Sequence, residues 1–183
     1  MATAKEWRDK MIAAGYRANV CPKAFNQLAE WAAKSQDRRY RKGLFLLGPC
    51  GTGKTMFLTT FLGKCRQFTA RRIVAMYNEA GATPDWHQAI HGYHVDTLIT
   101  TPPRSVILDD VGTEPVAMHF GQKSDVMQDI IADRYEYWQQ HEVKTFITTN
   151  LPFTEFDERY GRRITDRIGE MCDVIRFDGE SAR

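Results

Sequence analysis

The sequence contains no long hydrophobic run, and its longest uninterrupted apolar stretches, such as residues 44–47, are very short. A membrane-spanning helix needs roughly 20 consecutive apolar residues, so we expect no membrane span. The N-terminus is charged from Lys5 onward and lacks an apolar segment, which argues against a secretory signal. The four cysteines include no Cys-x-x-Cys pair, which disfavours a zinc knuckle or a disulfide framework. Together these absences favour a cytoplasmic protein.

Length and composition indicate one globular domain. The chain has 183 residues, of which 43% are hydrophobic and 26% charged, and these values disfavour disordered and fibrous classes. The net charge of +2 hides a local basic cluster, formed by Arg38, Arg39, Arg41 and Lys42. Such a cluster can contact the phosphate backbone of a nucleic acid, but a solvated turn before the first strand explains it equally well.

Short apolar runs alternate with amphipathic stretches along the chain. This alternation predicts an α/β fold with a five-stranded parallel sheet and helices on both faces. Helices are expected at residues 5–14, 22–34, 53–66, 84–98, 123–140 and 155–171. Strands are expected at residues 43–48, 72–76, 105–109, 144–149 and 173–177.

The most informative segment satisfies the pattern G-x-x-x-x-G-K-[ST] between a predicted strand and a predicted helix. Its members are Gly48, Pro49, Cys50, Gly51, Thr52, Gly53, Lys54 and Thr55. Glycines let backbone N–H groups converge on a polyphosphate, and the helix N-terminus adds partial positive charge. Lys54 would reach the terminal phosphates, and the Thr55 hydroxyl would be a ligand of Mg²⁺. The segment therefore predicts an ATP site.

Polar residues follow two other predicted strands at the same edge of the sheet, where open α/β folds gather their ligands. Asp109 would hold the hydrated Mg²⁺, and Asp110 would polarise the attacking water. Asn150 could orient the same water from the next strand. Taken alone, this asparagine could equally be a capping or turn residue before Pro152, but the polar ends of the two other strands favour the role at the site.

The order of these motifs resembles the AAA+ ATPases, and more closely their DnaC/IstB-like group of helicase loaders and transposition helpers. The resemblance rests on residues 48–55, 106–114, 130–135, 146–151, 165–168 and 177–183. It implies the strand order 5-1-4-3-2, a homo-oligomer with ATP at the subunit interface, and a role in bringing a replicative helicase or a transposase onto DNA. It also implies that Asn150 senses the γ-phosphate and that Arg167 reaches into the neighbouring subunit's site. Arg163, one helical turn earlier, is the second candidate for this role. Alternatively, Arg167 is only a charged residue on the surface of its helix.

Two departures from the group's pattern matter. Many AAA+ proteins have Asp-Glu where this chain has Asp109-Asp110, and the shorter side chain of Asp110 leads us to expect slow hydrolysis. Larger AAA+ proteins continue into a helical lid where this sequence stops at Arg183, so no separate lid is expected. The resulting division is a helical extension at residues 1–40, which could dock a partner, and an ATPase domain at residues 41–183.

Weaker signals have bland alternatives. His87, His91 and His94 are spaced along one helical face and could bind a metal, contact single-stranded DNA together with Tyr93, or simply pack. The apolar face of the first helix, formed by Trp7, Met11 and Ile12, could dock a helicase or pack on its own domain.

The leading functional hypothesis is an ATP-dependent helicase loader that contacts single-stranded DNA and a replicative helicase. The alternative is a transposition helper that assembles on duplex DNA and regulates a transposase. A small-molecule kinase is disfavoured because it would not need Asn150 at a strand end. A scaffold that binds ATP without useful turnover stays open.

Overall fold

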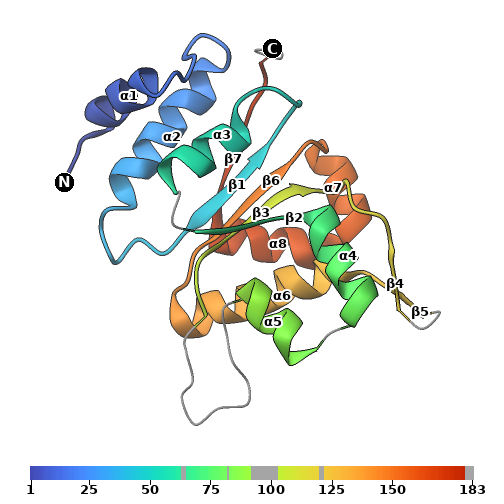
Figure 1. Cartoon of the computed structure of the whole chain (residues 1–183). Coiled ribbons are helices and arrows are strands. Elements are labelled where there is room, and N and C mark those ends of the chain that lie inside the picture. Colours follow the sequence, from blue (N-terminus) through green and yellow to red (C-terminus); the bar gives the residue numbers. More distant parts are fainter. Residues whose placement is uncertain (63–64, 82, 92–102, 120–121, 180–183) are drawn as a thin grey trace.

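A computed structural model describes residues 1–62, 65–81, 83–91, 103–119 and 122–179 of the chain (Figure 1). His94, Tyr93 and Arg183 lie outside these residues. The helices are α1 Ala4–Ala13, α2 Pro22–Lys34, α3 Lys54–Phe61, α4 Ala70–Ala80, α5 Pro84–His91, α6 Val126–His141, α7 Phe153–Tyr160 and α8 Arg162–Met171. The strands are β1 Gly43–Leu47, β2 Arg66–Thr69, β3 Val106–Val111, β4 Ala117–His119, β5 Gln122–Ser124, β6 Thr145–Thr149 and β7 Cys172–Arg176. No helix within the described ranges is both long enough and apolar enough to cross a membrane.

The central sheet has five parallel strands in the order β2-β3-β6-β1-β7. Counted from the other edge, this is the expected order 5-1-4-3-2, and the predicted α/β class is confirmed. Every residue of β1 and β6 is buried, as expected for strands covered on both faces. Because the strands are parallel, the carboxyl ends of β1, β3 and β6 meet at one edge of the sheet.

The two faces of the sheet carry separate hydrophobic layers. Along β1, Leu44 and Leu46 belong to the layer beneath α1, α2 and α3, whereas Phe45 and Leu47 belong to the layer beneath α4 to α8. This period-two alternation is the side-chain geometry of a strand. Figure 1 shows the two groups of helices on opposite sides of the strands.

The second predicted strand, at residues 72–76, is wrong. This segment lies in α4, and the edge strand is β2, immediately before it. The Thr69 side chain accepts a hydrogen bond from the Arg72 N–H and caps the helix. Ile73 and Val74 are buried while Arg71 and Arg72 are exposed, so the apolar run is one face of a helix. An apolar run this short does not distinguish the two-residue period of a strand from the 3.6-residue period of a helix.

Smaller differences concern helix ends and one hairpin. The helix expected at residues 155–171 is divided into α7 and α8 at Gly161, whose φ of 81° is in the left-handed region. The helix expected at residues 53–66 ends at Phe61. Strands β4 and β5 form an antiparallel pair that the sequence did not predict.

The N-terminal helices share a core with the sheet. Met11 of α1 is fully buried, in the same cluster as Phe57 of α3 and Ile107 of β3. The Trp7 and Phe61 rings meet edge to face with centroids 5.6 Å apart. Met11 and part of Trp7 are therefore covered by the chain itself, whereas Ile12 of the same predicted face is 55% exposed. Partner docking at residues 1–40 would have to use exposed side chains of this kind.

We expect Met11→Ala to lower the free energy of unfolding by about 2–4 kcal/mol, because it leaves a cavity between α1 and the sheet. The matched control is Ile12→Ala, the next residue of the same helix, whose side chain is 55% exposed and which should change stability by less than about 0.5 kcal/mol. Urea unfolding of both variants measures the difference. Equal effects would show that α1 does not pack as described.

Candidate nucleotide and metal site

The loop between β1 and α3 is shaped by glycines in the left-handed region. Gly48, Gly51 and Gly53 have φ values of 141°, 81° and 94°. A Cβ on Gly48 would lie 2.2 Å from the backbone oxygen of Phe177, so only glycine lets the loop pass this close to the segment after β7. The loop borders a cavity of about 280 Å³ that is also lined by Lys54, Thr55, Asp110 and Asn150. Asp110 and Asn150 thus share this cavity with five of the predicted loop residues, whereas Gly48 and Pro49 line a neighbouring one.

Lys54 is buried at the start of α3, and its ammonium donates three hydrogen bonds. Their acceptors are the backbone oxygens of Gly48 at 2.6 Å and Pro49 at 2.8 Å, and Oδ1 of Asn150 at 3.0 Å. Burial lowers the pKa of Lys54, and nearby ionisable groups, with Cys50 foremost, oppose that shift. All three acceptors are neutral, so a polyphosphate would be a better partner for this cation than the loop itself.

Asp109 is buried at the end of β3 and is held by three donors. Its Oδ1 accepts hydrogen bonds from the hydroxyls of Thr55 at 2.8 Å and Thr148 at 2.6 Å, and its Oδ2 accepts from Nε2 of Gln67 at 3.1 Å. The cavity of about 280 Å³ beside the glycine loop is called the phosphate cavity below. A carboxylate beside a hydroxyl at its edge is a set of hard oxygen donors, which Mg²⁺ prefers. The residues present therefore fit the expected ion.

A bulge in β3 accounts for the positions of both aspartates. Leu108 pairs with Ile147, but the next paired residues are Val111 and Thr149, so two residues of β3 face one residue of β6. Asp110 has a φ of 55°, in the left-handed region that few non-glycine residues occupy and that aspartate and asparagine adopt more readily than the others. In a regular strand successive side chains point to opposite faces, whereas a bulge redirects one of them. Asp109 and Asp110 can therefore serve the same site.

Thr148 and Asn150 hold this bulge from the neighbouring strand. The fully buried Thr148 hydroxyl accepts a hydrogen bond from the Asp110 N–H at 2.9 Å while donating to Asp109. Nδ2 of Asn150 donates to Oδ1 of Asp110 at 3.2 Å. Because Oδ1 of Asn150 also accepts from Lys54, this one amide connects the cation to the second acid.

Arg167 and Arg163 are not among the residues that line this cavity. Arg167 lies on α8, partly exposed, with its guanidinium 5.1 Å from the centre of the Tyr135 ring. Arg163 is exposed on the same helix. The structure thus leaves both arginines on the surface, where their roles stay predictions.

The histidine cluster lies only partly within the described residues. The His91 side chain is fully buried, with its Nε2 3.7 Å from a carboxylate oxygen of Asp133 and its ring against that of Tyr137. His87 falls in α5, and His94 lies outside the described residues. In the part of the chain that the structure describes, no three His, Cys, Asp or Glu side chains are grouped so that they could hold a metal.

The sequence did not indicate several residues at the site. Thr148 and Gln67 contact Asp109 from neighbouring strands. Tyr16 donates from its hydroxyl to the Gly53 oxygen at 3.3 Å. It borders a second cavity, of about 190 Å³, that shares Gly51, Gly53 and Met56 with the first. These contacts join residues far apart in the sequence, so no local pattern predicts them. Only Thr148 could have been suspected, because it lies two residues before Asn150 at the end of the same predicted strand.

Comparison with known proteins gives one family and several similar structures. Residues 22–183 match the family model described as IstB-like ATP binding protein. The chain is similar to the structure of DnaI (18% identity, 84% of each chain, TM-score 0.59) and to that of the DnaC helicase loader (18% identity, 85% of this chain and 90% of that one, TM-score 0.58). It is also similar to AMPPCP-bound DnaA from Aquifex aeolicus (16% identity, 83% of this chain and 46% of that one, TM-score 0.54). No curated protein sequence gives a significant match. At these identities the structural likenesses show a shared fold.

Proposed function

This chain belongs to the family of IstB-like ATP binding proteins, and from that premise we propose that it is an ATP-dependent loader that brings a replicative DNA helicase onto single-stranded DNA. The observation that carries the ATPase part is the convergence of Lys54, Asp110 and Asn150 on one cavity beside the glycine loop, with Asp109 and Thr55 at its edge. Nucleotide binding and water activation would then occur within one group of hydrogen-bonded side chains.

The polyphosphate of ATP would occupy the cavity beside the loop. The loop N–H groups and the N-terminus of α3 favour negative charge there. Lys54 would exchange its neutral acceptors for phosphate oxygens. The adjoining cavity beside Tyr16 shares part of the loop with this one, and we propose that it receives the base.

Asp109 and Thr55 would hold Mg²⁺, which supplies positive charge against the phosphate oxygens when it is bound. Asp110 would accept the proton of the attacking water, and Asn150 would fix the direction of that water through its amide. The carboxylate of Asp110 is one methylene shorter than a glutamate, which supports the expectation of slow turnover.

Phosphate release and nucleotide binding test the ATPase directly. We expect Lys54→Ala to abolish ATP binding, because the loop loses its only lysine ammonium, and Asp110→Asn to retain binding while turnover falls by about a hundredfold. Thr60→Ala, an exposed position on α3, serves as the control and should leave both quantities unchanged. Wild-type phosphate release equal to that of Lys54→Ala would reject the ATPase and favour a scaffold that only binds nucleotide.

We propose that the protein is a homo-oligomer in which Arg167 reaches the phosphate cavity of the next subunit. The always-charged guanidinium suits this role because it can neutralise charge that develops on the transferred phosphoryl group. Its partly exposed position on α8, apart from the cavity of its own chain, is compatible with a contact made between subunits.

Mixing inactive variants tests the interface. Lys54→Ala and Arg167→Ala should each be inactive alone, but a mixture should recover part of the hydrolysis, because an intact arginine then faces an intact phosphate site. The same mixture with Arg163→Ala in place of Arg167→Ala identifies which arginine acts. Full activity of Arg167→Ala alone would contradict its role.

The second candidate function is a transposition helper that assembles on duplex DNA and regulates a transposase, and the IstB-like family match favours it. The predicted basic cluster does not decide between the two. Arg39 pairs with Asp37, Arg41 pairs with Glu142, and Lys42 donates to the Gly169 oxygen. Arg38 is exposed, and the pairs of Arg39 and Arg41 lie on the surface, so the cluster stays accessible to the phosphates of either kind of DNA.

Electron microscopy with a non-hydrolysable ATP analogue separates the two functions. The loader predicts short assemblies on single-stranded DNA, whereas the transposition helper predicts long filaments on duplex DNA. Binding to either DNA should weaken steeply with added salt because the contacts are to phosphates. Lys54→Ala with the same DNA is the control and should form neither assembly.

A further inference from the structure

The segment that begins in the bulge, residues 110–115, is held in an unusual backbone conformation. It contains two left-handed residues, Asp110 with a φ of 55° and Gly112 with a φ of 102°. A Cβ on Gly112 would lie 2.5 Å from Cδ1 of Leu151, so this loop presses on the chain just beyond Asn150. A strained conformation of this kind persists only where the surrounding structure fixes it.

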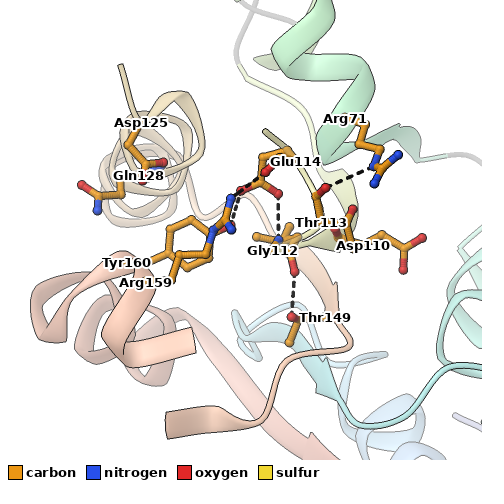
Figure 2. A network of polar contacts seen from close by, with 11 residues as sticks. Arg71, Asp110, Gly112, Thr113, Glu114, Asp125, Gln128, Thr149, Arg159 and Tyr160 are labelled. Atoms are coloured by element: carbon orange, nitrogen blue, oxygen red, sulfur yellow. Dashed lines mark hydrogen bonds and ion pairs between the residues drawn. The ribbon is translucent and has the colours of Figure 1, made fainter. Parts of the chain in front are cut away.

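Glu114 is the buried carboxylate that attaches this loop to α7. Its side chain is 3% exposed. Its Oε2 accepts a hydrogen bond from the Gly112 N–H at 2.8 Å, and its Oε1 accepts from Nη2 of Arg159 at 3.0 Å and from the Tyr160 hydroxyl. Nη2 of Arg159 also donates to the backbone oxygen of Glu114 at 2.7 Å. Figure 2 shows the Glu114 carboxylate between the loop and the two α7 side chains.

Other polar contacts complete the support of the loop. The Thr113 hydroxyl donates to the backbone oxygen of Asp110 at 2.8 Å, and the Thr149 hydroxyl donates to the backbone oxygen of Val111 at 2.7 Å. Nε of Arg71 donates to the Thr113 oxygen at 3.1 Å from the α4 side (Figure 2). Among these contacts, those of Glu114 connect the loop to the helix that begins three residues after Asn150.

We propose that Glu114 is a positioning residue for Asp110. Its contacts with α7 keep Oδ1 of Asp110 within hydrogen-bond distance, 3.2 Å, of Nδ2 of Asn150. The proposal rests on the proposed ATPase function. A buried ion pair is weak evidence for stability, because an apolar replacement of similar size is often as stable. Its contribution here is to fix the orientation of the 110–115 loop, since one carboxylate accepts hydrogen bonds from Gly112 on one side and from α7 on the other. Loss of that orientation would slow the hydrolytic step in which Asp110 accepts a proton from water.

The test is Glu114→Gln, which keeps the volume of the side chain. A glutamine has one acceptor oxygen, so it cannot accept from Gly112 and from α7 with both ends of its amide. We expect kcat to fall by about tenfold, with KM and the dissociation constant of a non-hydrolysable ATP analogue within about twofold of wild type. A merely structural role would lower stability and binding together and would not separate these quantities.

Two tyrosines provide a matched pair. Tyr160→Phe removes a phenolic hydrogen bond to Glu114, and Tyr40→Phe removes the same kind of bond to Asp173, beside the amino end of the sheet. We expect kcat to fall in Tyr160→Phe and to stay at the wild-type value in Tyr40→Phe. A kcat for Glu114→Gln within about twofold of wild type, or equal losses in the two tyrosine variants, would overturn the positioning role.

Hydrogen exchange of residues 110–115 provides a readout that does not depend on turnover. It should be faster in Glu114→Gln than in wild type because the single acceptor oxygen of glutamine cannot hold the Gly112 N–H and the α7 side chains together. Unchanged exchange would overturn the anchoring contact even if the wild type hydrolyses ATP. A wild type without hydrolysis would overturn the proposed function and the positioning role together, whereas an active wild type with an equally active variant overturns the positioning role alone.

Discussion

The bulge at the carboxyl end of β3 is the constraint on which the site depends. One extra residue in this strand lets Asp109 face Thr55 while Asp110 lines the phosphate cavity. The same extra residue forces Asp110 into a left-handed conformation, and a single hydroxyl, that of Thr148, contacts both aspartates. The chemistry at this edge therefore requires a backbone that the strand alone would not adopt.

Much of the fold could be predicted because its signals are local. Glycine-bounded apolar runs identified β1, and the phosphate loop was found because its residue types are needed at fixed spacing. The strand expected at residues 72–76 failed because Ile73 and Val74 fit either a strand or one face of a helix, and the Thr69 cap decided for the helix. The sheet order could be given only through a resemblance to known proteins, since no local pattern encodes which strands become neighbours.

The site shows the same division between local and non-local information. Asp109, Asp110 and Asn150 could be named because parallel strands deliver their carboxyl ends to one edge. Their supports could not be named, because Gln67 reaches Asp109 across a strand pair and Glu114 reaches α7 across 45 residues of sequence. The bulge itself has no sequence signal that we recognise. It appears only as a break in the pairing of β3 with β6.

The position of Lys54 links nucleotide binding to Asn150, the amide that also contacts Asp110. In this structure its ammonium shares Asn150 with Asp110: Oδ1 of the amide accepts from Lys54 while Nδ2 donates to Asp110. Phosphate oxygens that attract Lys54 would release Oδ1, because a cation that is buried among neutral acceptors gains most from an anionic one. Under the proposed function, the freed oxygen would then accept a hydrogen bond from the attacking water, whose other proton would go to Asp110. Asp110 would not follow this movement, because Thr148 and the Glu114 contacts hold its backbone independently of Lys54. One amide can thus change partners while the acid beside it stays in place.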